Sequence, residues 1–98
     1  MLHIQTIAKD NFNLSAALAE KERSLRGKQT TFFMSKRNVR KHEKYPGWIN
    51  IKKISNSILI FEIQTRAEGK EWQLIQAFTG YLHRHFAINL DQISIFYK

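Results

Sequence analysis

Seven basic residues between positions 36 and 53 have the types and the spacing to bind phosphate groups. They are Lys36, Arg37, Arg40, Lys41, Lys44, Lys52 and Lys53. Guanidinium and ammonium groups pair with phosphates through charge and hydrogen bonds. Tyr45 and Trp48 stand among these cations, and aromatic rings can stack on exposed bases. We therefore predict a small basic module that binds RNA or DNA through residues 36–53.

The distribution of charge supports this prediction. Eleven basic and two acidic residues between positions 21 and 53 give this third of the chain a net charge of +9, against +8 for the whole chain. A local excess of positive charge indicates an anionic partner, most often a nucleic acid. The alternative is a protein-interaction or self-assembling domain in which the positive charge follows from a lysine-rich composition and is incidental.

The apolar pattern of the strands favours this alternative. Residues 58–63 are apolar on both faces of a predicted strand except at Glu62, whereas the outer face of a sheet covered on one side is usually polar. Phe96, Trp48 and the isoleucines at positions 58 and 60 could together form an exposed apolar patch. We expect a homodimer that forms through the open face of the sheet or through an edge strand.

Catalysis is a third option. A metal-independent ribonuclease could use His42 as the base and Arg40 or Lys41 to stabilise the charged transition state. His83 and His85 are two positions apart on a predicted helix, so they point to different sides and suit no shared metal. The chain has no cysteine, and its glycines are isolated. We therefore predict no metal and no cofactor.

Strands and helices can be placed along the chain from its periodicity. Alternation predicts strands over residues 2–8, 30–34, 48–54, 58–65 and 92–97. Asn13 is a suitable N-cap for a first helix that ends before Gly27, and a second helix carries the apolar stripe from Trp72 to Phe86. Gly80 inside this second helix suggests a close approach by the sheet.

These elements predict a single α+β domain over residues 1–98. Two amphipathic helices would cover one face of a mainly antiparallel sheet, giving a two-layer sandwich in the order β-α-β-β-β-α-β. If residues 30–34 form no sheet strand, the order becomes β-α-β-β-α-β, which is the ferredoxin-like arrangement. The sequence leaves both orders open.

The location of the protein is predicted from what the chain lacks. It has no cysteine, its first ten residues have no basic start followed by a long apolar run, and its longest aliphatic or aromatic run covers only residues 58–61. These observations argue against a secretory signal and against a membrane span. We expect a soluble, cytoplasmic protein without a membrane partner.

Overall fold

The computed structural model describes residues 2–25, 32–36, 38–66 and 70–97, without the side chains of residues 33–36. The elements are β1 (Leu2–Ala8), α1 (Leu14–Leu25), β2 (Phe32–Lys36), β3 (Val39–His42), β4 (Trp48–Lys53), β5 (Ile58–Gln64), α2 (Glu71–Phe86), the short 3-10 helix η1 (Ala87–Asn89) and β6 (Leu90–Tyr97). Asn13 caps α1 as predicted, because its side-chain Oδ1 accepts a hydrogen bond from the N–H of Ala16 at 3.0 Å.

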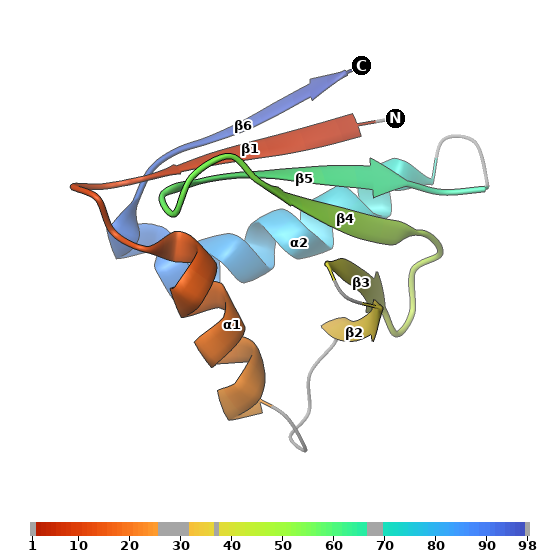
Figure 1. Cartoon of the computed structure of the whole chain (residues 1–98). Coiled ribbons are helices and arrows are strands. Elements are labelled where there is room, and N and C mark those ends of the chain that lie inside the picture. The colour runs from red at the N-terminus through yellow and green to blue at the C-terminus, as the bar shows by residue number, and fades with distance from the viewer. Residues whose placement is uncertain (1, 26–31, 37, 67–69, 98) are drawn as a thin grey trace.

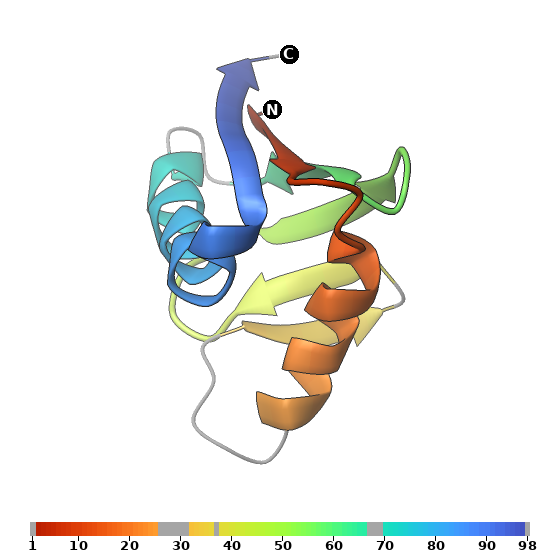
Figure 2. The same ribbon diagram turned by 90° about the vertical axis from the view of Figure 1, so that its left-hand side faces the viewer.

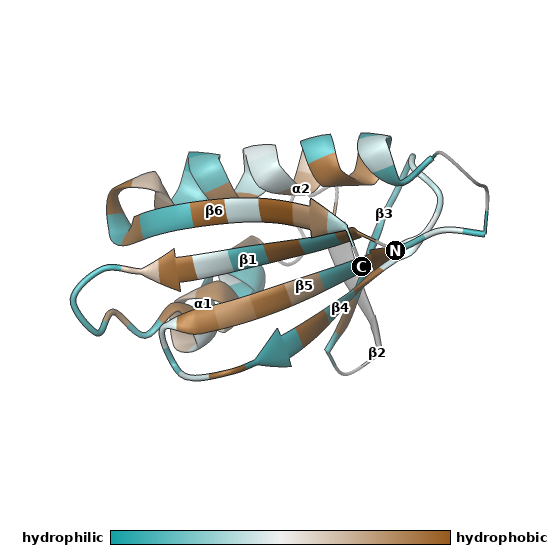
Figure 3. Ribbon diagram, turned by 90° about the horizontal axis from the view of Figure 1, so that it is seen from above, coloured by the Kyte–Doolittle hydropathy of each residue, from teal (hydrophilic) through white to brown (hydrophobic). Residues whose placement is uncertain are grey.

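The strands form one sheet in the order β2-β3-β4-β5-β1-β6, and every neighbouring pair is antiparallel. Both helices lie on the same side of this sheet (Figure 1). The predicted two-layer α+β class is therefore confirmed. Neither described helix covers the opposite side of β6, β1, β5 and β4, and Figure 3 views the sheet from this uncovered side.

The observed order, β-α-β-β-β-β-α-β, has one strand more than the longer of the two predicted orders. Without β2 and β3, the elements β1, α1, β4, β5, α2 and β6 follow the ferredoxin-like order. The hairpin β2–β3 is inserted between α1 and β4 and extends the sheet beyond β4 (Figure 1). Strand β3 was not predicted, since its residues fall in the basic segment. Asn38 precedes it with φ 62°, a left-handed conformation that Asn tolerates.

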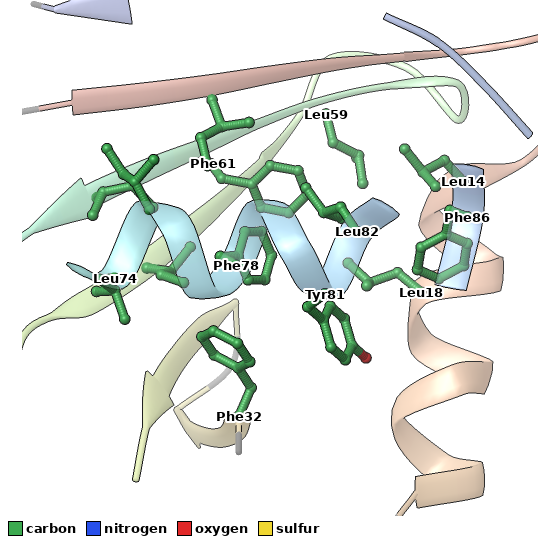
Figure 4. Packing of buried hydrophobic residues seen from close by; sticks show 14 of the residues in the cluster. Leu14, Leu18, Phe32, Leu59, Phe61, Leu74, Phe78, Tyr81, Leu82 and Phe86 are labelled. Atoms are coloured by element: carbon green, nitrogen blue, oxygen red, sulfur yellow. The ribbon is translucent and has the colours of Figure 1, made fainter. Parts of the chain in front are cut away.

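The apolar core lies between the sheet and the helices. Paired residues of neighbouring strands project to the same side, so Ile63 and Phe61 of β5 share the helix-covered face with Leu2 and Ile4 of β1. All four side chains are buried. Figure 4 shows how α2 completes this core with a row of buried side chains that includes Phe78.

The hairpin β2–β3 contributes to the same core. Phe32 of β2 packs edge-on against Phe78 with ring centroids 5.2 Å apart, and Phe61 of β5 packs against Phe78 at 4.8 Å. Figure 4 shows Phe32 and Phe61 on different sides of the Phe78 ring. The sheet therefore curls around α2, and the hairpin that carries part of the positive charge also closes the core.

The two glycines among the described residues have different roles. Gly47 has φ +109°, and a Cβ there would meet the carbonyl oxygen of Gln64 at 2.4 Å, so this turn requires glycine. Gly80 lies in the middle of α2, and a Cβ there would meet nothing within 4 Å. The predicted close approach of the sheet at Gly80 is therefore wrong.

Candidate nucleic-acid interface

Two of the predicted cations project from the uncovered face of the sheet. Lys41 is on the same side of β3 as Val39, which pairs with Asn50 of β4. Asn50 in turn shares its side of β4 with Lys52, and it pairs with Glu62 on the face opposite the buried core. Lys41 and Lys52 are both exposed. These two adjacent strands therefore present ammonium groups on one face.

Two further cations lie near the ends of the same strands. Lys44 is exposed in the connection between β3 and β4, and Lys53 is exposed at the last position of β4. Lys36 pairs through its backbone with Val39, while its side chain and the whole of Arg37 lie outside the described residues. Lys41, Lys44, Lys52 and Lys53 are thus exposed cations of β3, β4 and their connection. Lys53 differs from Lys52 in direction, because it pairs with the buried Leu59 and projects from the helix-covered face at the far end of β4.

Arg40 points the other way, toward the helices. It pairs with Ile49, a buried residue of the helix-covered face. Its Nη2 donates a hydrogen bond to Oε1 of Glu22 at 2.9 Å, and its Nε donates to Oε2 of the same carboxylate. The Arg40 and Glu22 side chains are only 13% and 23% exposed. This bidentate ion pair joins α1 to β3, so it fixes the hairpin and balances the charge of Arg40.

Lys52 is also paired, but in a more open setting. Its Nζ lies 3.1 Å from Oε2 of Glu62, and Nε2 of His3 lies 3.9 Å from the same oxygen. The Lys52 side chain is 62% exposed and the Glu62 side chain 14%. Because an exposed ion pair is weak in water, the ammonium group of Lys52 can still reach a phosphate.

His42 has a structural role in the basic segment. Its Nδ1 accepts hydrogen bonds from the backbone N–H groups of Lys44 at 2.9 Å and Tyr45 at 3.2 Å. Burial lowers the pKa of His42; Lys44 lowers the pKa further, while Glu43 opposes the change. Since Nδ1 holds the turn after β3, only Nε2 could serve the base role considered for a ribonuclease.

The aromatic residues near the basic segment pack partly against other side chains of the protein. The ring of Tyr45 stacks on that of His42 with centroids 4.5 Å apart, and the edge of Phe32 meets His42 at 4.9 Å. Trp48 is half-buried at the start of β4. These rings therefore offer less surface for stacking on bases than the sequence suggests.

A second group of polar side chains lies where the two helices approach the hairpin. Burial and the nearby Glu22 raise the pKa of Tyr81 to about 12, against the opposing effect of Arg40. Burial, followed by Lys21 and Arg84, lowers the pKa of His85. Both changes favour the uncharged side chain, because a partly buried charge loses its hydration. Neither Tyr81 nor His85 therefore adds a charge to this region at neutral pH.

Sequence reasoning missed the ion pair of Arg40 with Glu22. The two residues are 18 positions apart, and neither the strand β3 nor the packing of α1 against it was expected. Alternation along residues 39–42 is the one signal that could have separated Arg40 from Lys41, since neighbouring residues of a strand face opposite sides.

Comparisons with models of protein families, with curated proteins and with solved structures found no significant match to this chain. In the described ranges, no three His, Asp or Glu side chains come together as a metal site would require. The search of the described helices found none that is both long and apolar enough for a membrane span. The function must therefore be argued from the geometry of the chain itself.

Proposed function

We propose that this protein binds nucleic acid through phosphate contacts on the β3–β4 side of its sheet. The observation that carries the proposal is the grouping of Lys41, Lys44, Lys52 and Lys53 as exposed cations on two adjacent strands and their connection. Glu43 and Glu62 are the only acids in these strands, their connection and the neighbouring β5, and Glu62 is already paired. Lys36 and Arg37 are candidate phosphate contacts from the sequence alone.

The proposed mode of binding is dominated by the phosphate backbone. Cations that contact phosphates release counterions, which gives affinity that is strongly salt-dependent and largely independent of sequence. Single-strand platforms that read bases use exposed aromatic rings on a sheet. Here the rings on the uncovered face belong to the buried His3 and to the half-buried Trp48 and Phe96, beside residues such as Gln5 and Ile60. We therefore expect weak discrimination between base sequences.

The proposal can be tested with a labelled single-stranded RNA of about 20 nucleotides and a fluorescence anisotropy titration at several salt concentrations. Four phosphate contacts predict a slope of log K against log salt near −2.8, at about −0.7 per contact. The triple variant Lys41→Ser, Lys44→Ser, Lys53→Ser should bring this slope to about −0.7. Lys52 is kept in this variant because its removal would deprive the largely buried Glu62 of its nearest cation.

A matched control removes the same amount of charge elsewhere. Lys9, Arg23 and Arg84 are exposed on the β1–α1 connection, α1 and α2, which are elements outside β3, β4 and their connection. Replacing these three by Ser should leave the slope near that of the original protein. Equal effects of the two triple variants would mean that net charge alone drives binding, and absence of binding at low salt would reject the function.

A further inference from the structure

The edge strand β6 has an unusual composition for an exposed edge. It is the longest strand of the sheet, and the only strand with which it pairs in the described structure is β1. Natural edge strands are protected by lysines, prolines or bulges that prevent pairing with another chain. In β6 the only charge is Asp91 near the start, and the register irregularity lies opposite that same end. Residues 93–97 therefore form a regular, uncharged edge.

Large apolar side chains accompany this edge. Ile95 and Tyr97 project from the helix-covered face of β6, because they pair with the buried residues Ile4 and Leu2. They are nevertheless 42% and 84% exposed. Figures 2 and 3 show why: the N-terminal half of α2 runs beside the C-terminal half of β6 and lies outside the edge of the sheet. Helix α2 therefore leaves this end of β6 only partly covered.

Helix α2 adds its own apolar residue to the same region. Trp72 is 52% exposed and lies on the same side of α2 as Thr79, since seven residues make about two turns. This side borders the row of Ile75 and Leu82, which are buried beneath the sheet. The hydroxyl Oγ1 of Thr79 is buried without a hydrogen-bond partner in the described structure. A strand added beside β6 would lie over this side of α2.

The available area matches what a modest dimer requires. If a Trp or Tyr side chain presents roughly 200 Å², the exposed parts of Tyr97 and Trp72 offer roughly 270 Å² per copy. Two copies, together with Ile95 and the edge backbone, reach about 1,000 Å², the lower bound for a specific interface. The other two large apolar residues that are most exposed in the described ranges, Ile54 and Ile88, lie after β4 and on η1, apart from this group.

The distribution of charge favours a second copy as the occupant. Strand β4, the nearest basic strand, is three strand spacings from β6, or roughly 14 Å. Charges at that distance are beyond the screening length of about 8 Å at physiological salt. Two copies that meet at β6 therefore keep their basic sides apart. A strongly charged partner, in contrast, would find little opposite charge along residues 93–97.

We propose that the protein forms a two-fold dimer in which β6 pairs antiparallel with β6 of a second copy. Centring the two-fold axis on Ile95 brings its two copies together and places each Tyr97 opposite Ile93 of the other chain. All these side chains lie on the helix side, where Trp72 can cover them. The two sheets become one continuous sheet, and each edge acquires the hydrogen-bonding partner that it lacks. This proposal is independent of nucleic-acid binding.

The test measures the mass of the full chain by sedimentation at about 0.5 M NaCl, where any bound nucleic acid is released. The original protein should be a dimer, and the variant Ile95→Lys, Tyr97→Lys should be a monomer with an unchanged circular dichroism spectrum. Ile88, which is 83% exposed on η1, supplies the control, because Ile88→Lys should remain a dimer. A monomeric original protein, or a dimer that survives in the double variant, would overturn the proposal.

A second measurement checks the position of the axis and covers the case in which the double lysine variant fails to fold. The chain has no cysteine, so single-cysteine variants can report proximity without background. Residues opposite each other in antiparallel strands lie about 5 Å apart at Cα, within the reach of a disulfide. Ile95→Cys should form a covalent dimer on mild oxidation, and Ile88→Cys should not. A dimer in which Ile95→Cys stays uncrosslinked would also contradict the proposal.

Discussion

The ion pair of Arg40 with Glu22 makes a quantitative prediction about stability. Exposed ion pairs contribute at most about 1 kcal/mol, whereas removing one partner of a buried pair costs about 3–5 kcal/mol. Because the two side chains are 13% and 23% exposed, this pair lies between the two limits. We expect Glu22→Gln and Arg40→Met each to reduce the free energy of unfolding by about 2 kcal/mol, from the middle of these ranges.

The coupling between the two residues is the sharper quantity. The double variant should lose much less than the sum of the single losses, because each single change leaves the other charge partly buried and unpaired. We expect a coupling of about 1.5 kcal/mol from urea unfolding of the four proteins of the cycle. Each single variant should also melt about 8–16 °C lower, at about 4–8 °C per kcal/mol for a domain of this size.

The pair of Lys52 with Glu62 is the control for this cycle. Lys52 is 62% exposed, so its coupling to Glu62 should not exceed about 1 kcal/mol and should fall with added salt. A coupling of Arg40 with Glu22 below about 0.5 kcal/mol would refute the assignment of a structural role to Arg40. The same cycle informs the functional proposal, since Arg40→Met should leave the salt slope of RNA binding unchanged.

Three further substitutions test the account of the fold. Gly80→Ala should raise the free energy of unfolding by up to about 1 kcal/mol in urea titrations, because alanine favours helix and its Cβ would stand in open space; a loss of stability would contradict this. Phe32→Ala should cost about 3 kcal/mol in the same assay, since Phe32 closes the core against Phe78, and a cost under about 1 kcal/mol would place the hairpin outside the core. The free energy of unfolding should decrease as the pH falls below about 6.5. The folded protein lowers the pKa of His42, so the unfolded chain binds the proton at a higher pH and is favoured by it. The variant His42→Asn keeps an acceptor for the N–H of Lys44 but does not titrate. Its free energy of unfolding should therefore change less between pH 7.5 and 5.5 than that of the original protein. An equal change in both proteins would show that His42 does not cause the pH dependence.

The apolar strands and helices were predictable because their periodicity is strong. Residues 58–64 form a run of β-branched and other apolar residues typical of a strand, and the strand was placed within one residue of its observed bounds. The apolar stripe from Trp72 to Phe86 repeats at helical spacing and lies within α2. The two-layer arrangement followed, since two amphipathic helices need one shared surface. Local pattern was sufficient for these elements because burial on one face dictates the residue types along it.

Strand β3 could not be predicted in the same way. Its residues Val39, Arg40, Lys41 and His42 are mostly basic or polar, and the side that faces the helices carries a charged residue. Arg40 is tolerated there because Glu22 of α1 lies beside it. This contact depends on the tertiary structure and cannot be read from the local sequence. For the same reason, the sequence grouped Arg40 with Lys41 as phosphate contacts, although the structure directs them to opposite faces.

The inserted hairpin makes charge and folding interdependent in this protein. The hairpin that contains Lys41 begins with Phe32, and the ring of Phe32 packs against one side of Phe78 in the core. A shortened chain that joined α1 straight to β4 would retain the ferredoxin-like order, yet it would open the aromatic interior to water. Substitutions on the exposed surface of the hairpin should therefore be compatible with folding, whereas deletion of the hairpin should not.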